Sequence, residues 1–483
     1  MSRDENKKQL KFTKFVLYAW KSCTVITGKF AQQNAEKLHN GKMYDIIIYE
    51  VIAMSLTEKG YKKRLIDNKI EEYLKIFGAI SIEGPKWCGK TWTAKNHANS
   101  AVFLDDSTNN FDTRTKAQMD VSLVLDKDKP QLIDEWGQVP EIWDAVRHRC
   151  DKDKEKGKYI LTESTTLRTK EAEEKIHHSG AGRIDRMKMY SMSLYESGDS
   201  CGAASLKALF DGTQDNVAVS KPSFEKLAEY IVRGGWPENV EISGKYCHIL
   251  PKSYLNAVLN SDINKDGVSR DINKMNMLFK SLARNESTIA SNTTLLSDIE
   301  EYTSNKEYQL SRNTIADYLS VLSKLYLTEN QDAYSVNLRS KEVVGKSPKR
   351  HFTDPSLACA ALDITKDKLM NDVRTFGFMF ESLVERDLRI YIESLGGKLY
   401  HYRNNKNGVE VDAIVELPGG DCGAIEIKLG ANEIEDAKQS LTRFSDEVKI
   451  DPKFKCVICG LWDAVVKDPE TGIYILPITA LKD

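Results

Sequence analysis

Residues 84–91 combine two glycines, a lysine and a threonine at the spacing of a phosphate-binding loop. The segment fits the pattern G-x-x-x-x-G-K-[ST] at every fixed position. In such a loop the backbone N–H groups cradle phosphate oxygens, Lys90 reaches the β- and γ-phosphates, and the Thr91 hydroxyl holds Mg²⁺. The candidate nucleotide-binding residues are Gly84, Pro85, Lys86, Trp87, Cys88, Gly89, Lys90 and Thr91.

The segments on either side of this loop have the patterns that a phosphate site needs. Residues 78–83 are typical of a short buried strand, and residues 91–98 can open a helix. The alternative is an ordinary glycine turn that fits the pattern by chance, but such a turn need not lie between a strand and a helix. The sequence therefore predicts a strand, a phosphate loop and a helix in succession.

Two later apolar runs end in polar residues that suit the same chemistry. Residues 131–135 read as a strand ending in Asp134, a candidate for the Mg²⁺ water shell, and Glu135, a candidate to polarise the attacking water. Residues 159–162 read as a third strand, with Thr162 and Ser164 at its polar end. These hydroxyls either sense a γ-phosphate or simply cap the strand.

An arginine before the next apolar segment is the candidate for stabilising charge on the γ-phosphate. Arg183 precedes residues 184–195, which close the region of alternating strands and helices. We expect it to act within its own chain or across a subunit interface, as arginine fingers do. The alternative is a structural salt bridge.

The middle of the chain has the pattern of a winged helix. Residues 287–302 and 312–325 are predicted helices, and Ser311 is placed to cap the second. A predicted hairpin follows, with a basic connection made of Arg339, Lys341, Lys346, Lys349 and Arg350. Such a module either docks the Arg312 helix in double-stranded DNA with the basic wing along phosphates, or packs between domains.

A second acidic site is predicted near the C-terminus. Residues 409–416 and 424–428 are predicted strands joined by a turn at residues 418–421, and alternation places side chains on shared faces. Asp412 and Glu426 are candidate ligands for Mg²⁺ or Mn²⁺, and Lys428 is a candidate to steer water or stabilise charge. Glu381, on a predicted helix over residues 376–395, is a candidate helper. The alternative is a solvated strand face with a Glu426–Lys428 ion pair.

Composition excludes some classes of protein. The 69 Lys and Arg residues balance the 71 Asp and Glu residues, so the net charge of −2 gives no global attraction to nucleic acid. No apolar run approaches the roughly 20 residues of a membrane helix, and no signal peptide is evident. The nine scattered cysteines indicate a reduced, cytoplasmic protein. The Cys456–Cys459 pair is predicted to lie in a core strand.

Residues before Met54 do not resemble the rest of the chain. They carry a basic start and no motif, whereas residues 54–64 look like a natural protein start. We expect residues 1–57 to be an annotation-derived or lineage-specific extension.

Taken together, these motifs resemble prokaryotic AAA-type ATPases with a C-terminal domain of unknown function that has a PD-(D/E)xK nuclease-like fold. The motifs that carry the resemblance are residues 82–91, 132–136, 180–184, 192–198, 234–238, 380–383, 410–412 and 426–428. The resemblance implies an α/β fold: a P-loop ATPase core with a parallel sheet at 58–205, a helical lid at 206–285, a winged helix at 286–358 and a restriction-endonuclease-like α/β domain at 359–483. Two residues depart from the family pattern. Glu163 stands where glycine is usual and is expected to weaken hydrolysis by repulsion, and Val411 replaces a proline.

The expected function is that of an ATPase. The chain is predicted to bind ATP and Mg²⁺, to hydrolyse ATP slowly and to act as a nucleotide-switched machine on or near DNA. A homo-oligomer is a further expectation. The alternative is a non-catalytic signalling or scaffold ATPase whose winged helix and C-terminal domain bind protein partners. Cleavage of nucleic acid by the C-terminal domain is a separate prediction, set against a binding platform without activity.

Overall fold

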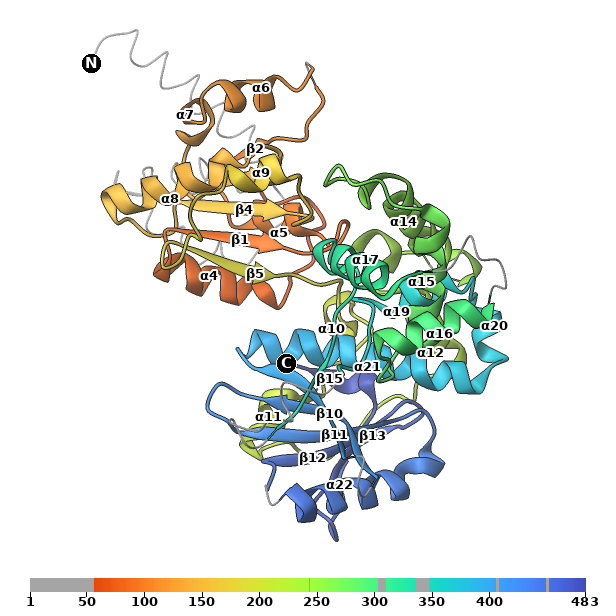
Figure 1. Cartoon of the computed structure of the whole chain (residues 1–483). Helices are drawn as coiled ribbons and strands as arrows, with labels where there is room; N and C mark the ends of the chain where they lie inside the picture. The colour runs from red at the N-terminus through yellow and green to blue at the C-terminus, as the bar shows by residue number, and fades with distance from the viewer. Residues whose placement is uncertain are drawn as a thin grey trace, which may run out of the picture. The chain divides into compact units, whose positions relative to one another are not determined.

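A computed structural model describes residues 56–108, 110–242, 244–302, 310–335, 347–404, 408–448 and 451–483 (Figure 1). The predicted extension, apart from Leu56 and Thr57, and the proposed start at Met54 lie outside these residues, as do Arg339, Lys341 and Lys346. Residues Leu56–Asp483 form one compact unit. Within the described residues no helix is long and apolar enough to cross a membrane.

The first part of this unit is built on a five-stranded parallel sheet with the strand order β2-β3-β4-β1-β5. The three central strands β3, β4 and β1 are buried along their whole length, as is usual when helices cover both faces of a parallel sheet, whereas the edge strands β2 and β5 are partly exposed. Their bounds are β1 Ala79–Glu83, β2 Ser100–Phe103, β3 Gln131–Asp134, β4 Tyr159–Glu163 and β5 Ile184–Lys188.

Alternate residues of these strands enter two different hydrophobic clusters. Ile80 and Ile82 of β1 belong to one cluster, whereas Ala79 belongs to the other. The second cluster also contains Trp136 and Trp143, whose rings lie 4.8 Å apart. The helices of this part are α4 Ile66–Ile76, α5 Lys90–Asn96, α6 Asp112–Met119, α7 Ser122–Leu125, η2 Trp136–Gln138, α8 Glu141–Asp153, α9 Lys170–Glu174 and α10 Leu194–Ser197.

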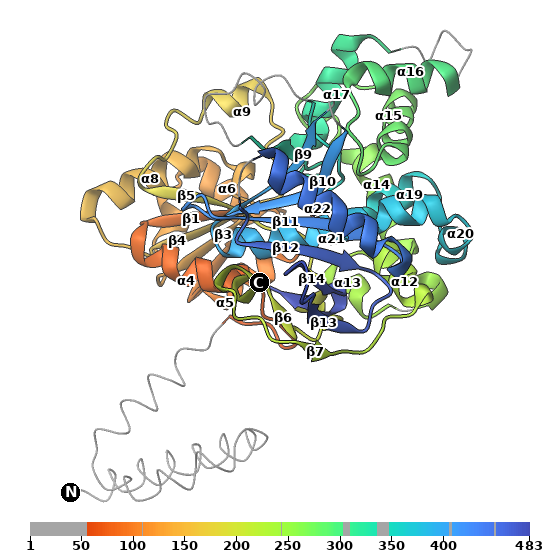
Figure 2. The same cartoon turned by 90° about the horizontal axis from the view of Figure 1, so that it is seen from below.

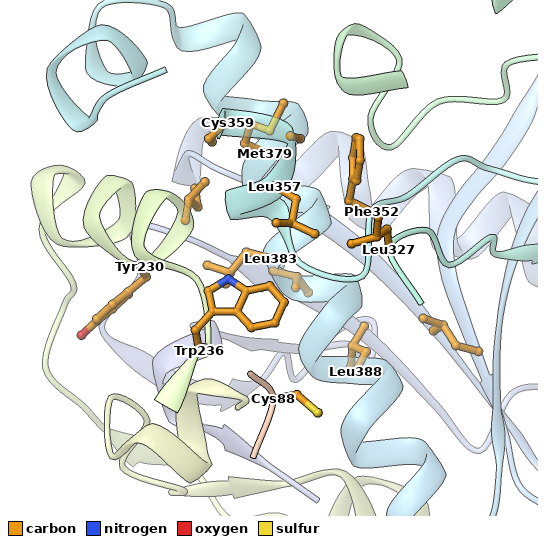
Figure 3. Packing of buried hydrophobic residues seen from close by; sticks show 14 of the residues in the cluster. Cys88, Tyr230, Trp236, Leu327, Phe352, Leu357, Cys359, Met379, Leu383 and Leu388 are labelled. Atoms are coloured by element: carbon orange, nitrogen blue, oxygen red, sulfur yellow. The ribbon is translucent and has the colours of Figure 1, made fainter. Parts of the chain in front are cut away.

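A helical region follows, and its helices share one core with the segments around residue 355. Helix α19 packs against α12, α14 and α15, so the predicted lid and the predicted winged helix are joined through it. Figure 3 shows part of this core, including Trp236, Leu357 and Leu383. The helices are α11 Leu206–Asp211, α12 Phe224–Arg233, α13 Pro237–Val240, η3 Gly244–Tyr246, α14 Ile249–Ala257, the π turn η4 Val258–Asp262, α15 Ile272–Arg284, α16 Asn292–Tyr302, α17 Arg312–Lys324, α19 Pro355–Ala361 and α20 Lys366–Met370.

The predicted wing differs from the expectation. Residues 327–334 and 347–353 form the base of a hairpin, termed here the 327–353 hairpin, through the bridges Thr328↔Phe352 and Gln331↔Lys349. Its strand β8 (Asp332–Ala333) pairs in parallel with β9 of the C-terminal sheet. The described base of the wing is therefore part of the C-terminal sheet, since β8 forms its backbone hydrogen bonds with β9. Helix α16 also begins at Asn292 rather than at residue 287.

The C-terminal part is a mixed sheet between two helices. Its strand order is β7-β13-β14-β12-β11-β10-β9-β8. Helix α21 (Val373–Ser394) packs with Ile425 and Ile427, and helix α22 (Ile434–Val448) packs with Val411 and Ala424, so the two helices cover opposite faces (Figures 1 and 2). The remaining elements are β6 Ala204–Ser205, β7 Val217–Ala218, β9 Lys398–Asn404, β10 Val409–Glu416, β11 Cys422–Lys428, η6 Ala431–Glu433, β12 Phe454–Cys459, β13 Ala464–Lys467, β14 Tyr474–Leu476, η7 Ile478–Ala480 and β15 Leu481–Lys482.

The cysteines of β12 lie in the core, as predicted. Cys456 and Cys459 belong to the clusters on opposite faces of the sheet. They therefore cannot bind one metal ion together, and the core-strand interpretation is confirmed.

Candidate functional site

The phosphate loop connects the end of β1 to the start of α5, and both of its glycines are required by geometry. A side chain at Gly84 would meet the carbonyl oxygen of Met189 at 2.1 Å. Gly89 has φ +103°, in the left-handed region that favours glycine. The loop therefore needs small residues at both positions, which fits the close approach of a backbone to phosphates.

The lysine of the loop is buried and bonded to the loop itself. Its ammonium donates to the carbonyl oxygens of Gly84 at 3.0 Å and Pro85 at 2.8 Å. Phosphate oxygens can replace these carbonyl partners, because a hydrogen bond between an ammonium and an anionic oxygen is stronger than one to a neutral carbonyl. Both of these acceptors are uncharged, so the positive charge of Lys90 is kept for phosphate oxygens.

Two hydroxyls from different elements meet on one acid. Thr91 Oγ1 donates to Asp134 Oδ1 at 2.9 Å, and Thr162 Oγ1 donates to the same oxygen at 2.6 Å. Burial raises the pKa of Asp134, although both hydroxyls act in the opposite direction. Since both hydroxyls use Oδ1, Oδ2 remains for the water shell of a cation. The donor set of one hydroxyl and one carboxylate beside a phosphate loop fits ATP-bound Mg²⁺.

The next residue, Glu135, is bonded to both Thr162 and Ser164, at the end of β4. Glu135 has φ +55°, and its backbone N–H donates to Thr162 Oγ1 at 3.1 Å. The hydroxyl of Ser164 donates to Glu135 Oε1, and the Ser164 N–H lies 3.4 Å from Oε2. Thr162 and Ser164 therefore bind the two acids rather than the end of their own strand.

Glu163 does not lie with these hydroxyls. Strand alternation turns it to the other face of β4, where it is buried, pairs with Arg168 and faces Gly137. Burial raises the pKa of Glu163 to about 8, and nearby Glu83 adds to that rise while Arg168 opposes it. The prediction that Glu163 lies beside the γ-phosphate sensor and repels the nucleotide is therefore wrong.

The other predicted loop residues attach the loop to the helical region. Lys86 pairs with Asp262 of η4 at 2.8 Å, and the Trp87 ring lies 5.3 Å from the Tyr254 ring of α14. Cys88 is fully buried. These side chains connect the loop to neighbouring elements, so a direct role of each in holding nucleotide stays a prediction.

Sequence reasoning missed one residue that supports the loop from behind. Arg64 donates to the carbonyl of Cys88 at 2.8 Å and pairs with Glu196 at 3.0 Å. It also donates to the carbonyls of Tyr190 and Ser191. The only signal was a basic segment at residues 62–64, which does not distinguish a buried arginine from a solvated one.

Arg183 is not brought to the phosphate loop. Its carbonyl accepts from the N–H of Ala79, the first residue of β1, whereas the loop leaves β1 at Glu83. Its side chain is 47% exposed and pairs with Asp151. Arg183 lies where the parallel strands begin, whereas the phosphate loop lies where they end. It therefore cannot reach a γ-phosphate bound in its own chain. The action across a subunit interface stays a prediction.

The acidic residues of the C-terminal sheet are brought together as the strand alternation predicted. Lys428 Nζ lies 2.7 Å from Glu426 Oε2 and 3.4 Å from Asp412 Oδ2. The N–H of Ile427 donates to the same oxygen of Asp412 at 2.9 Å. A bulge in β10 between Val411 and Ile414 adjusts the local register at this acid. Burial, with Asp412 nearby, raises the pKa of Glu426 to about 8.

Glu381 joins this group from helix α21, but a lysine stands beside it. Lys349 Nζ lies 2.5 Å from Glu381 Oε1 and 3.2 Å from Glu385 Oε1. Within the described part of the chain, no three His, Cys, Asp or Glu side chains are placed to hold a metal ion. The four predicted nuclease-like residues thus gather, but as a network of ion pairs.

The cations expected on the wing differ in their accessibility. Lys349 is 2% exposed, and Arg350 donates to the Ala290 carbonyl at 3.0 Å and to Asn292 Oδ1 at 2.9 Å. Arg312, the first residue of α17, is exposed. The prediction that Lys349 contacts DNA phosphates is wrong, because its ammonium is buried against Glu381 and Glu385. Arg350 is half-buried and bonded to neutral oxygens, so its contact with DNA stays a prediction.

Comparison with known families divides the chain into three matched segments. A model of an AAA domain matches residues 77–197. Models of two domains of unknown function, DUF8612 and DUF4143, match residues 224–368 and 376–481. No curated protein matches the chain.

Two solved structures show weak similarity. The Walker-type ATPase PABY2304 of Pyrococcus abyssi is 12% identical, with 64% of this chain and 98% of that chain covered and a TM-score of 0.38. The ORC2 protein of Aeropyrum pernix, in its ADPNP–ADP complexes, is 11% identical, with 66% and 98% covered and a TM-score of 0.30. At these scores neither structure bears on the function of this chain.

The parallel sheet and the phosphate loop lie in the segment, residues 77–197, that matches the AAA domain family. It is followed by a helical region and a mixed-sheet domain, both matching families of unknown function.

Proposed function

We propose that the protein binds ATP with Mg²⁺, hydrolyses it slowly and acts as a nucleotide-controlled switch. The observation that carries this proposal is the convergence of Thr91 and Thr162 on Asp134 beside the Lys90 loop. A phosphate loop alone only binds; the added acid and hydroxyls supply what a hydrolytic site requires.

Each residue has a distinct part in the proposed reaction. A water attacks the γ-phosphorus in line, the bond from that phosphorus to the β–γ bridging oxygen breaks, and ADP and phosphate leave. Glu135 orients the water and draws off its proton, while Lys90 stabilises charge on the β- and γ-phosphate oxygens. Thr91 and, through water, Asp134 would hold Mg²⁺, whose chemistry there would be to neutralise charge on the same oxygens.

The loop after β4 links this site to the helical region, which supports the switch. This loop carries Ser164, the partner of Glu135. Two residues further on, the Thr166 N–H donates to the Lys324 carbonyl at the end of α17 at 2.9 Å. Release of Glu135 from Ser164 on nucleotide binding would therefore move a segment that is attached to α17.

A binding experiment tests the nucleotide site. Lys90→Ala should weaken the affinity for a fluorescent ATP analogue by at least about tenfold, because a charged donor to the phosphates is lost. Lys95→Ala is the matched control, since Lys95 lies on the same helix and pairs with Glu58 instead. Equal affinity of Lys90→Ala and the control would reject the proposal.

The finer proposal is that this switch acts on or near DNA, through the exposed Arg312 end of α17. The rival is a scaffold ATPase whose winged helix and C-terminal domain bind protein partners. The burial of Lys349 against Glu381 favours this rival, because it removes one cation from the surface. The ATPase rate measured with and without double-stranded DNA separates these functions. Stimulation that disappears at high salt would support DNA, and an unchanged rate would support protein partners.

The domain boundaries given above and a homo-oligomeric state belong to the same proposal. Sedimentation analysis with and without ATP tests the oligomer. A single monomeric species in both conditions would reject it.

A further inference from the structure

A lysine of the 327–353 hairpin reaches into the acidic group of the C-terminal domain. The ammonium of Lys349 lies 2.5 Å from Glu381 Oε1, 3.2 Å from Glu385 Oε1 and 3.4 Å from the backbone carbonyl oxygen of Asp412. The side chain is 2% exposed. Three oxygens from a helix and a strand thus surround a buried charge that the hairpin brings from elsewhere in the chain.

The backbone around this lysine is fixed on both sides. Lys349 and Gln331 exchange two backbone hydrogen bonds of 3.0 Å. The Gln331 amide in turn donates to the carbonyls of Tyr400 at 2.8 Å and Asp412 at 3.2 Å. The hairpin is therefore bonded to β9 and β10 next to the point where the ammonium enters, and the charge has little freedom to leave alone.

The charges around Lys349 are matched to it. His351, on the same hairpin, lies 2.9 Å from Glu385 Oε2. Against the effect of burial, His351 and Lys349 lower the pKa of Glu385 to about 2. Burial raises the pKa of Glu381 to about 8, although Lys349 opposes that rise. Glu385 is therefore the ionised carboxylate that faces the ammonium, and a buried charge without such a partner would be costly.

A second lysine fills the other side of the group. Lys428 pairs with the carboxylates of Asp412 and Glu426, whereas Lys349 contacts the backbone carbonyl of Asp412. A divalent cation needs several oxygen ligands directed at one point. Here the oxygens of Glu381, Asp412 and Glu426 are directed at two ammonium groups instead.

We propose that Lys349 is a tethered cation of the C-terminal domain: its ammonium satisfies the acidic group, and the domain takes no divalent metal while the hairpin is docked. The inference concerns a site remote from the nucleotide loop and goes beyond the ATP-dependent switch. Its consequence is that the nuclease-like residues serve to dock the hairpin rather than to cut nucleic acid.

Metal binding to the nucleotide-free full chain tests the proposal, with Mn²⁺ alone as the probe and electron paramagnetic resonance as the readout. The wild type and Asp412→Asn are expected to retain the same amount of Mn²⁺, because no ion binds at Asp412 while the hairpin is docked. Lys349→Met removes the charge at similar length, and we expect it to bind Mn²⁺. The double variant Lys349→Met/Asp412→Asn is expected to lose that ion.

Thermal unfolding gives a second readout. In EDTA, Lys349→Met should melt about 3–5 °C below the wild type, because carboxylates are left buried without a partner, and Mn²⁺ should restore part of the loss. The control is Lys252→Met, which removes a lysine from an exposed pair with Asp363. It should change little and show no Mn²⁺ effect.

Two results would overturn the proposal: Mn²⁺ binding by the wild type that Asp412→Asn abolishes, or a folded Lys349→Met that takes no Mn²⁺. Should Lys349→Met fail to fold, Lys349→Gln replaces it, and the wild-type measurement decides by itself whether the docked site accepts metal. Because no nucleotide is present, neither result depends on the ATP site.

Discussion

The phenol of Tyr326 donates a hydrogen bond of 2.9 Å to Oε2 of Glu83, the residue with which β1 ends and from which the phosphate loop departs. Tyr326 follows helix α17, so this bond ties the helical region to the strand that carries the loop. Lys188 of β5 also forms an ion pair with Glu329, which follows the same helix. The nucleotide site and α17 are thus connected by specific polar bonds.

The first prediction is that Tyr326→Phe uncouples the two regions. The ring is kept and one hydrogen bond is lost, so the ATP affinity should stay within about twofold, while ATP-dependent protection of α17 in hydrogen exchange should shrink. Tyr318→Phe is the control, because its hydroxyl accepts from the Asp271 N–H inside the helical region. Identical protection in wild type and Tyr326→Phe would contradict the coupling.

The second prediction concerns the proposed base. Glu135→Gln should retain ATP affinity and lower turnover by about 10²- to 10⁴-fold, because the amide cannot accept the proton of the attacking water. Phosphate release in single-turnover experiments measures this. Glu141→Gln, which alters an acid paired with Lys175 at 2.8 Å at the start of α8, should leave turnover unchanged. Wild-type turnover in Glu135→Gln would remove Glu135 from the role.

The third prediction tests Arg183 across a subunit interface. Since its own phosphate loop is out of reach, we expect turnover per chain to rise with protein concentration in the wild type and to stay flat in Arg183→Ala. Arg147→Ala is a matched control, because Arg147 pairs with the same Asp151 at 3.2 Å. If both variants behave as the wild type, Arg183 is a structural salt-bridge residue only.

The fourth prediction addresses DNA binding by α17. Arg312→Ala should weaken binding to double-stranded DNA and reduce the slope of log affinity against log salt by about 1, because one phosphate contact is lost. Arg374→Ala, which alters an exposed arginine near the start of α21, serves as the control in the same mobility-shift titration. Unaltered affinity in Arg312→Ala would exclude this surface.

The fifth prediction follows from the pKa of Glu163, which burial raises from the ordinary glutamate value of 4.5 to about 8. Between these values the folded state binds more protons than the unfolded state, so this group's contribution to the free energy of unfolding falls as pH rises. The slope is at most about 1.4 kcal/mol per pH unit. Glu163→Gln should flatten stability between pH 5 and 8 in urea titrations, whereas Glu174→Gln, at an exposed acid of α9, should not. An unchanged slope in Glu163→Gln would show that Glu163 titrates normally.

Local sequence was sufficient for the parts of both sites that lie on single strands and their adjacent turns. The phosphate loop, Asp134 and Thr162 were predictable because parallel strands deliver their carboxyl ends to one edge of a sheet. Strand alternation likewise placed Asp412, Glu426 and Lys428 together. These relationships depend only on strand period and direction, which the order of residues encodes.

Tertiary structure decided the roles of the long cationic side chains. Arg64, Arg183 and Lys349 each stand in segments that look solvated and basic, yet Arg64 supports the phosphate loop and Arg183 lies at the far edge of the sheet. Lys349 is buried against Glu381, 32 residues later in the chain. The destination of such a charge depends on which distant carboxylates and carbonyls the packed elements bring near it, and no local spacing encodes that.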